Sequence, residues 1–284
     1  MTPPTPTPVR SLGIALGFGG ALLLSSDSLV VRTVDVGPWD VAFWVGLCSG
    51  ISVFVVLAAR GGIGLRREGW PMWASAALQT ASSLLFILGV KATTVANVVV
   101  ILAAAPVVGA VTARVVLGER TGRRVWAAIG ATFIGITIVV GDSLGAGRIT
   151  GDLYALGAVA SFAVNLTLWR HHQELRRTLA VGLAGWMMAA AALVPADITA
   201  PGTRDLVLLI VLGAVIGPIA RICLGTATRH LSAAEVSLFV PVETVSATVG
   251  AWIAFGEQPP VATAVGGCIV LGSVVGGLAR RRPG

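Results

Sequence analysis

Apolar residues along the chain fall into long blocks that are separated by short polar segments. A block of roughly 17–25 apolar residues is long enough to cross a bilayer as a helix. Backbone groups in lipid must be satisfied within the segment unless a barrel closes, and the blocks lack the alternation of barrel strands. The pattern therefore predicts ten spanning helices, over about residues 11–31, 39–59, 71–90, 95–117, 125–141, 151–169, 179–195, 206–228, 233–255 and 261–279.

The composition agrees with an integral membrane protein of the all-α class. Of 284 residues, 55% are hydrophobic and only 12% are charged, which is too few charges to cover the surface of a soluble domain. The first apolar block is long for a cleaved signal peptide, and Ser25-Ser26-Asp27 is a poor cleavage site, so this block is interpreted as the first span. Residues 1–10 hold four prolines and are expected to be a disordered tail.

The net charge of +7 is distributed unevenly between the two sets of predicted helix ends. Short loops rich in arginine stay in the cytoplasm. The asymmetry predicts that both termini are cytoplasmic, supports an even number of helices and argues against nucleic acid as the partner of the basic charge. Four basic residues lie at one set of ends, namely Arg32, Lys91, Arg148 and Arg204, and fourteen at the other, namely Arg10, Arg60, Arg66, Arg67, Arg120, Arg123, Arg124, Arg170, Arg176, Arg177, Arg229, Arg280, Arg281 and Arg282.

A Gly-Glu pair closes an apolar block in each half of the chain. Gly118-Glu119 is followed by arginines, whereas Gly256-Glu257, which lies 138 positions later, is not. A half with five helices contains an odd number, so the second copy must be inverted in the membrane. The sequence therefore predicts two inverted five-helix repeats, residues 11–142 and 151–280, which is a common frame of secondary transporters.

The residues around these pairs resemble a known family, the ten-helix EamA-type branch of the drug/metabolite transporter superfamily, over roughly residues 10–280. The resemblance implies a basket of helices around a central cavity, lined by helices one, three, four, six, eight and nine, with alternating access by rocking of the two halves. Members often have Glu-Pro in helix nine, whereas here Thr244 follows Glu243 and Pro241 precedes it, so a helix break is expected to be displaced. The residues that carry the resemblance are Ala92-Thr93-Thr94-Val95-Ala96, Pro106, Leu117-Gly118-Glu119-Arg120, Leu231-Ser232-Ala233-Ala234, Glu243 and Phe255-Gly256-Glu257.

Polar residues inside the spans are the candidates for binding a substrate. A charge at the bilayer centre costs at least about 2.5–3.5 kcal/mol, so each one needs a physical reason. Glu243 and Arg221 lie at similar depth on consecutive antiparallel helices, which predicts a buried ion pair that is either static or faces the cavity and binds substrate or a proton. Pro218 is expected to open the backbone next to Arg221. The candidate cavity residues are Asp27, Gln79, Asn97, Asn165, Arg221, Glu235 and Glu243.

Each of the other candidates has a structural role as an alternative to lining the cavity. Asp27 has no partner that the sequence identifies, and either reaches the interface or faces the cavity. Asn97 and Glu235 begin their helices at equivalent repeat positions, which favours capping. Gln79 and Asn165 either line the cavity or bond across helices.

These features predict a secondary transporter, an exporter of a small metabolite or amino-acid-like solute across the cytoplasmic membrane, acting as a monomer or homodimer. No phosphate loop of the form GxxxxGK[ST] and no CxxC spacing occurs, so we expect no ATP hydrolysis, no metal and no cofactor. The alternative is a membrane-embedded enzyme such as an intramembrane hydrolase. Its best support, Asp142 and Asp152, lies at outer helix ends, without a second aspartate deep in a facing helix. We therefore expect no enzymatic activity.

Overall fold

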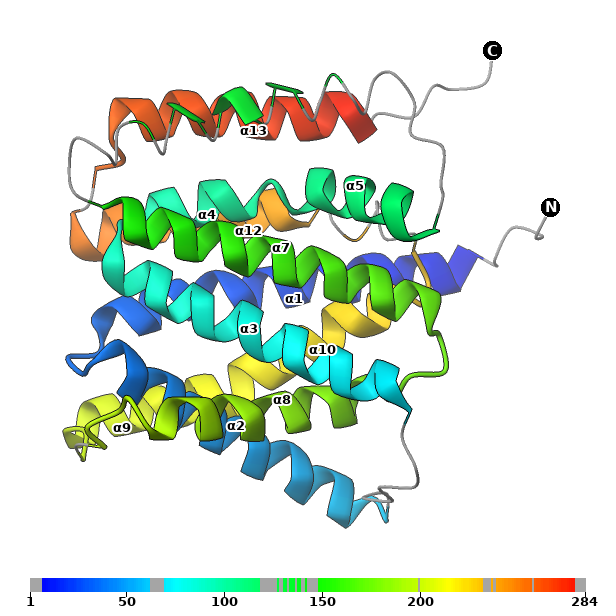
Figure 1. Ribbon diagram of the computed structural model, residues 1–284, viewed down its shortest axis with the longest axis vertical. Coiled ribbons are helices and arrows are strands. Elements are labelled where there is room, and N and C mark those ends of the chain that lie inside the picture. Colours follow the sequence, from blue (N-terminus) through cyan, green and yellow to red (C-terminus); the bar gives the residue numbers. More distant parts are fainter. Residues whose placement is uncertain are drawn as a thin grey trace.

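The structure of this protein, a computed structural model, describes most of the chain and consists of helices. The described residues are 7–61, 69–117, 127, 130–131, 133–135, 137–138, 141, 148–198, 200–231, 236, 239–256 and 258–278. Every regular element within them is a helix, and Figure 1 shows these helices lying side by side with alternating direction. The predicted all-α fold class is confirmed.

The helices follow the predicted order. In the first half they are α1 (Thr7–Thr33), α2 (Pro38–Ala59), α3 (Trp70–Ala92), α4 (Val95–Leu102) and α5 (Ala105–Leu117). In the second half they are α7 (Ile149–His171), α8 (Arg177–Leu193), α9 (Thr203–Ile210), the π-helix η1 (Val211–Ile216), α10 (Gly217–Ala227), α12 (Val240–Phe255) and α13 (Val261–Leu278).

Several of these helices are long and apolar enough to span a membrane. Within the described residues there are five: Ser11–Thr33, Pro38–Ala59, Trp70–Ala92, Ile149–His171 and Thr203–Ala227. Shorter apolar helices cover Val95–Gly109, Arg177–Leu193 and Val245–Phe255. Most of the fifth predicted span, residues 125–141, lies outside the described residues. Helix α1 begins at Thr7, and so it includes the last four residues of the segment expected to be a disordered tail.

Prolines accompany two interruptions of the helical backbone. The residues Ala103 and Ala104 form a turn between α4 and α5, just before Pro106, which has no backbone N–H to donate. The π-helix η1 ends at Ile216, two residues before Pro218, and the turn that carries Arg221 itself is regular α-helix, so the irregular backbone precedes the proline and is not next to Arg221. Pro241 occupies the first turn of α12, where a missing N–H costs nothing.

Several helix contacts in one half of the chain have a counterpart in the other half. The contact of α1 with α10 has its counterpart in that of α7 with α3, and the contact of α1 with α12 in that of α7 with α4 and α5. The pair α2–α8 corresponds to itself. In Figure 1, α1 runs from right to left whereas α7 runs from left to right. This is the arrangement expected of two inverted copies related by a two-fold axis.

Corresponding helices also end at corresponding positions. Helices α1 and α7 end at Thr33 and His171. These two ends are separated by 138 positions, the shift that the Gly-Glu pairs predicted. Glu119, Glu257 and their neighbour Gly118 lie outside the described residues.

Glycines let the central helices α2 and α8 approach until their backbones touch. A Cβ atom added at Gly185 would lie 2.6 Å from the Gly50 nitrogen and 2.8 Å from the Gly46 oxygen. A Cβ at Gly46 would lie 2.7 Å from the Ala189 nitrogen. Such close approach supplies dispersion contact between helices in lipid, where the hydrophobic effect adds little.

We expect Gly185→Ala to destabilise the protein by about 1–3 kcal/mol, because the new methyl group must push two backbones apart. The measurement is the thermal unfolding of the purified protein in detergent. Gly19→Ala is the matched control, since a Cβ there would meet nothing within 4 Å and the change improves helix propensity. Equal melting temperatures for the two variants would contradict the backbone contact.

Candidate functional site

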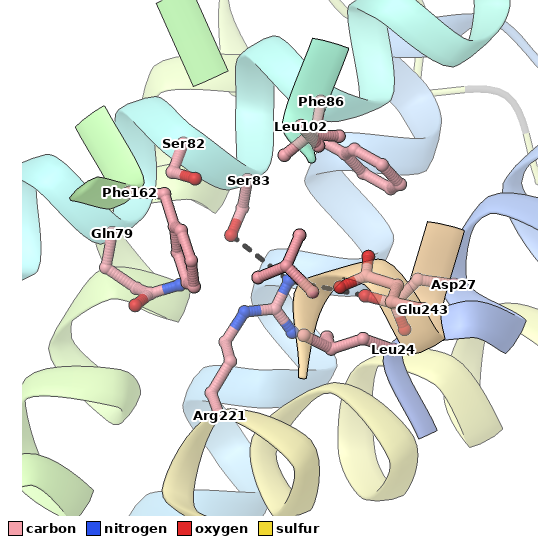
Figure 2. A pocket seen from close by; sticks show the side chains of 11 residues that line it. Leu24, Asp27, Gln79, Ser82, Ser83, Phe86, Leu102, Phe162, Arg221 and Glu243 are labelled. Atoms are coloured by element: carbon pink, nitrogen blue, oxygen red, sulfur yellow. Dashed lines mark hydrogen bonds and ion pairs between the residues drawn. The ribbon is translucent and has the colours of Figure 1, made fainter. Parts of the chain in front are cut away.

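A pocket lies at the meeting point of five helices, α1, α3, α7, α10 and α12, with Leu102 of α4 closing one side (Figure 2). The free volume between its side chains is about 50 Å³, which holds a few water molecules and is narrower than the usual small-molecule site. Its lining combines three ionisable groups, three neutral polar groups and an apolar remainder. The eleven residues are Leu24, Asp27, Gln79, Ser82, Ser83, Phe86, Leu102, Phe162, Arg221, Val240 and Glu243.

Arg221 stands at the centre of the polar part of this pocket. Its Nη2 atom lies 3.4 Å from Oδ2 of Asp27 in an ion pair and donates to Oγ of Ser83 at 3.2 Å. The side chains of Arg221 and Asp27 are only 18% and 7% exposed. A guanidinium and a carboxylate removed from water to this extent each need a partner, so the pair fixes α10 against α1.

The predicted ion pair between Glu243 and Arg221 is wrong, and Asp27 takes the place of Glu243. Within the described residues, Glu243 forms no ion pair with Arg221, although its side chain lines the same pocket. Equal depth on consecutive helices suggested the wrong partner because α1, which is distant in sequence, packs directly on α10. Figure 2 shows both carboxylates on the same side of the guanidinium. The expectation that Asp27 has no partner is corrected by the same contact.

Gln79 is held at the pocket by a chain of buried hydrogen bonds between α3 and α7. The Nε1 atom of Trp169 donates to Oγ of Ser75 at 2.7 Å, and this hydroxyl donates to Oδ1 of Asn165 at 2.8 Å. The Nδ2 atom of Asn165 then donates to Oε1 of Gln79 at 3.1 Å. The Gln79 oxygen is thereby satisfied, and Figure 2 shows its amide nitrogen directed toward the pocket. Asn165 therefore forms hydrogen bonds between helices, which is one of the two roles predicted for it. Its bond to Gln79 positions the Gln79 side chain at the pocket.

Of the remaining two candidates, the structure describes Asn97. Asn97 is completely buried in α4, where its Oδ1 accepts a hydrogen bond from Oγ1 of Thr263 on α13. The N-cap of α4 is Thr94, whose side chain accepts from the backbone N–H of Asn97. Asn97 thus ties α4 to α13 and does not line the pocket. Glu235 lies outside the described residues.

Residues at equivalent repeat positions face each other across the pocket. Ser83 and Arg221, which are joined by a hydrogen bond, are 138 positions apart. The same shift relates Leu24 to Phe162 and Leu102 to Val240, and all of these residues line the pocket. The pocket therefore lies on the axis that relates the two halves. Sequence analysis missed Ser83, Leu102 and Phe162, although the 138-position shift applied to Arg221 identifies Ser83.

A second pocket continues from the first toward α2 and α8. It shares Gln79, Ser83 and Arg221 with the first pocket and has a free volume of about 20 Å³. Its lining includes Gly185 and Gly213, at which α8 and η1 lie close to the backbone of α2. The polar groups of Gln79, Ser83 and Arg221 thus separate two chambers along the interface of the two halves.

Two segments of the chain, residues 11–141 and 149–277, match the EamA-like transporter family. The two matches begin 138 positions apart and cover most of the chain. The protein belongs to the EamA-like transporter family. It is also similar to a solved chain described only as "Crystal structure of protein", with 20% sequence identity, a TM-score of 0.70 and coverage of 96% of this chain and 99% of the other. At that identity the likeness shows the shared fold. No curated protein matches the chain.

Membership of the EamA-like family identifies a multi-pass membrane protein of a transporter family. The apolar helices described above agree with this assignment. Among the described residues, no group of three or more His, Cys, Asp or Glu side chains lies close enough together to hold a metal ion.

We expect strong energetic coupling between positions 27 and 221. Arg221→Gln alone should cost about 3–5 kcal/mol of stability, because it leaves the Asp27 carboxylate buried without its cation. The double variant Asp27→Asn/Arg221→Gln should be more stable than Arg221→Gln alone, since it removes both charges. Thermal unfolding in detergent measures both. The same cycle with Glu243→Gln in place of Asp27→Asn should give a smaller coupling energy with Arg221→Gln. A larger coupling energy for Glu243 than for Asp27 would support the Glu243–Arg221 ion pair that the sequence predicted.

Proposed function

We propose that this EamA-like protein is a secondary transporter that exports a small metabolite or amino-acid-like solute across the cytoplasmic membrane. The observation that most directly supports this proposal is the position of the polar pocket, which is lined by equivalent residues from both halves. The halves, residues 11–142 and 151–280, rock against each other about this pocket and expose it to one side of the membrane at a time. The export direction follows the family resemblance. No chemical step on the solute is involved.

The interruptions in the helices support such a motion. The π-helix η1 (Val211–Ile216) precedes the turn of α10 that carries Arg221, and α12 begins three residues before Glu243. A π-turn lacks the regular hydrogen-bond ladder of an α-helix, so it offers a place where the helix bends. In the first half, the turn at Ala103 and Ala104 follows Leu102 on the opposite wall. Movement at these points changes the pocket shape without unfolding a span.

The basic residues orient the protein in the membrane. The start of α1 and the end of α13 lie on the same side of the molecule in Figure 1. That side also carries the segment between α7 and α8, which includes Arg176 and ends at Arg177, and the end of α2 next to Arg60. By the positive-inside rule, this side and both termini face the cytoplasm.

We expect an impermeant maleimide added to intact cells to label Gly202→Cys and Gln258→Cys but not Gly61→Cys or Glu174→Cys. The first two positions are exposed at the side with few basic residues and the last two at the basic side. Labelling requires a background in which Cys48, Cys223 and Cys268 are replaced by serine. Permeabilised cells provide the control, because all four positions should then react. Labelling of position 61 or 174 from outside would refute the orientation.

The transport activity is tested with purified protein in liposomes that are loaded with a defined mixture of amino acids and small amines. We expect protein-dependent release of at least one solute, recovered unchanged in mass. Recovery of a chemically altered product would favour the membrane-embedded enzyme.

Blocking the pocket should abolish that release. Ser82→Leu places an apolar side chain into the pocket, and we expect it to reduce flux about tenfold or more because it overlaps the bound solute. Ser52→Leu is the matched control, since Ser52 lines a separate groove beside Val56 and Ile219. If both variants keep full flux while remaining folded, the solute does not pass through the central pocket.

A further inference from the structure

The central pocket holds one more acidic group than basic group. Among its eleven lining residues, Asp27 and Glu243 carry carboxyl groups and Arg221 is the single cation. One guanidinium neutralises one carboxylate, and the structure assigns it to Asp27. Among the residues that the structure describes, Glu243 forms no close ion pair, and an unpaired charge inside the span is expensive.

Asp27 itself has unused capacity to accept a hydrogen bond. Its side chain is only 7% exposed. Only Oδ2 contacts Arg221, whereas Oδ1 is buried and has no hydrogen-bond partner. A buried carboxylate oxygen that is left unpaired costs free energy, so an arriving donor that meets it gains an interaction that water does not supply in the empty site. Figure 2 shows this carboxylate and that of Glu243 next to each other at the pocket.

The groups around the carboxylates define the remainder of the ligand. Leu24, Phe86, Leu102, Phe162 and Val240 surround the space beside the two acids. They offer no hydrogen bonds from their side chains, so they suit an apolar substituent. Arg221 is already engaged by Asp27 and Ser83, and a carboxylate on the ligand would have to compete with Asp27 for it.

We propose that the pocket binds a small amine with a net charge of plus one and an apolar side chain, whose ammonium group lies beside Asp27 and Glu243. This inference rests on the proposed transport function and names the charge class of the solute. The ammonium group supplies the second positive charge that the two carboxylates require. A zwitterion leaves the site one charge out of balance, and an anion adds a further negative charge.

Three compounds with the same side chain and different charge test this proposal: leucinamide, leucine and N-acetylleucine. Between the carboxyl pKa of about 3.5 and the amino pKa of about 8, their net charges are positive, zero and negative. Binding to the purified full-length protein in detergent is measured by calorimetry. We expect leucinamide to bind about tenfold or more tightly than leucine, because charges at contact distance interact strongly in a buried site. N-acetylleucine should bind weakest.

Glu243→Gln removes the excess negative charge and keeps the shape of the side chain. We expect this variant to lose the preference for leucinamide over leucine, while Glu174→Gln, at an exposed loop position, keeps the wild-type order. Equally tight binding of leucine and leucinamide to the wild-type protein would overturn the proposal. That result is expected if one of the two carboxyl groups always holds a proton, because the pocket then has no excess negative charge. Absence of leucinamide binding would overturn it as well. Binding in the expected order without flux in liposomes would instead contradict the transport function.

Discussion

The ion pair between Asp27 and Arg221 is the interaction on which the centre of this structure depends. It joins α1 of the first half to α10 of the second half, with both side chains almost fully buried. Two charges in the middle of an apolar bundle persist only when they are paired and hydrogen-bonded, and Ser83 supplies the additional hydrogen bond. Because the pair crosses the interface between the halves, any rocking of one half against the other has to rearrange it or carry it along.

The chemistry of the pocket arises where the two repeats differ. At the positions equivalent to Asp27, Arg221 and Glu243, the other half has Asn165, Ser83 and Ala105. Neutral groups on one side of the axis form the fixed chain from Trp169 to Gln79. Charged groups on the other side form the ion pair and leave one carboxylate in excess. Symmetric helix packing thus provides the frame, and asymmetric substitution on that frame provides a site with a definite charge.

Helix approach and site formation are linked through the glycines. Contact between α2 and α8 at Gly46, Gly50 and Gly185 brings the two halves together on one side of the axis. The second pocket ends at this contact and is separated from the main pocket only by Gln79, Ser83 and Arg221. Larger residues at the glycines would widen the interface and change the distance between the very groups that separate the chambers.

Local features of the sequence were sufficient for the all-helical fold class, the family resemblance and the shift of 138 positions between repeats, because the length of the apolar blocks and the repeat spacing can be read along the chain. They also identified Asp27, Gln79, Arg221 and Glu243 as costly residues that need a role. Their partners were decided only in the tertiary structure. Arg221 pairs with a residue 194 positions away, through packing of α1 on α10, and not with its near neighbour Glu243. Depth along a span can be counted from the sequence, whereas the facing of one helix toward another depends on how all the helices pack.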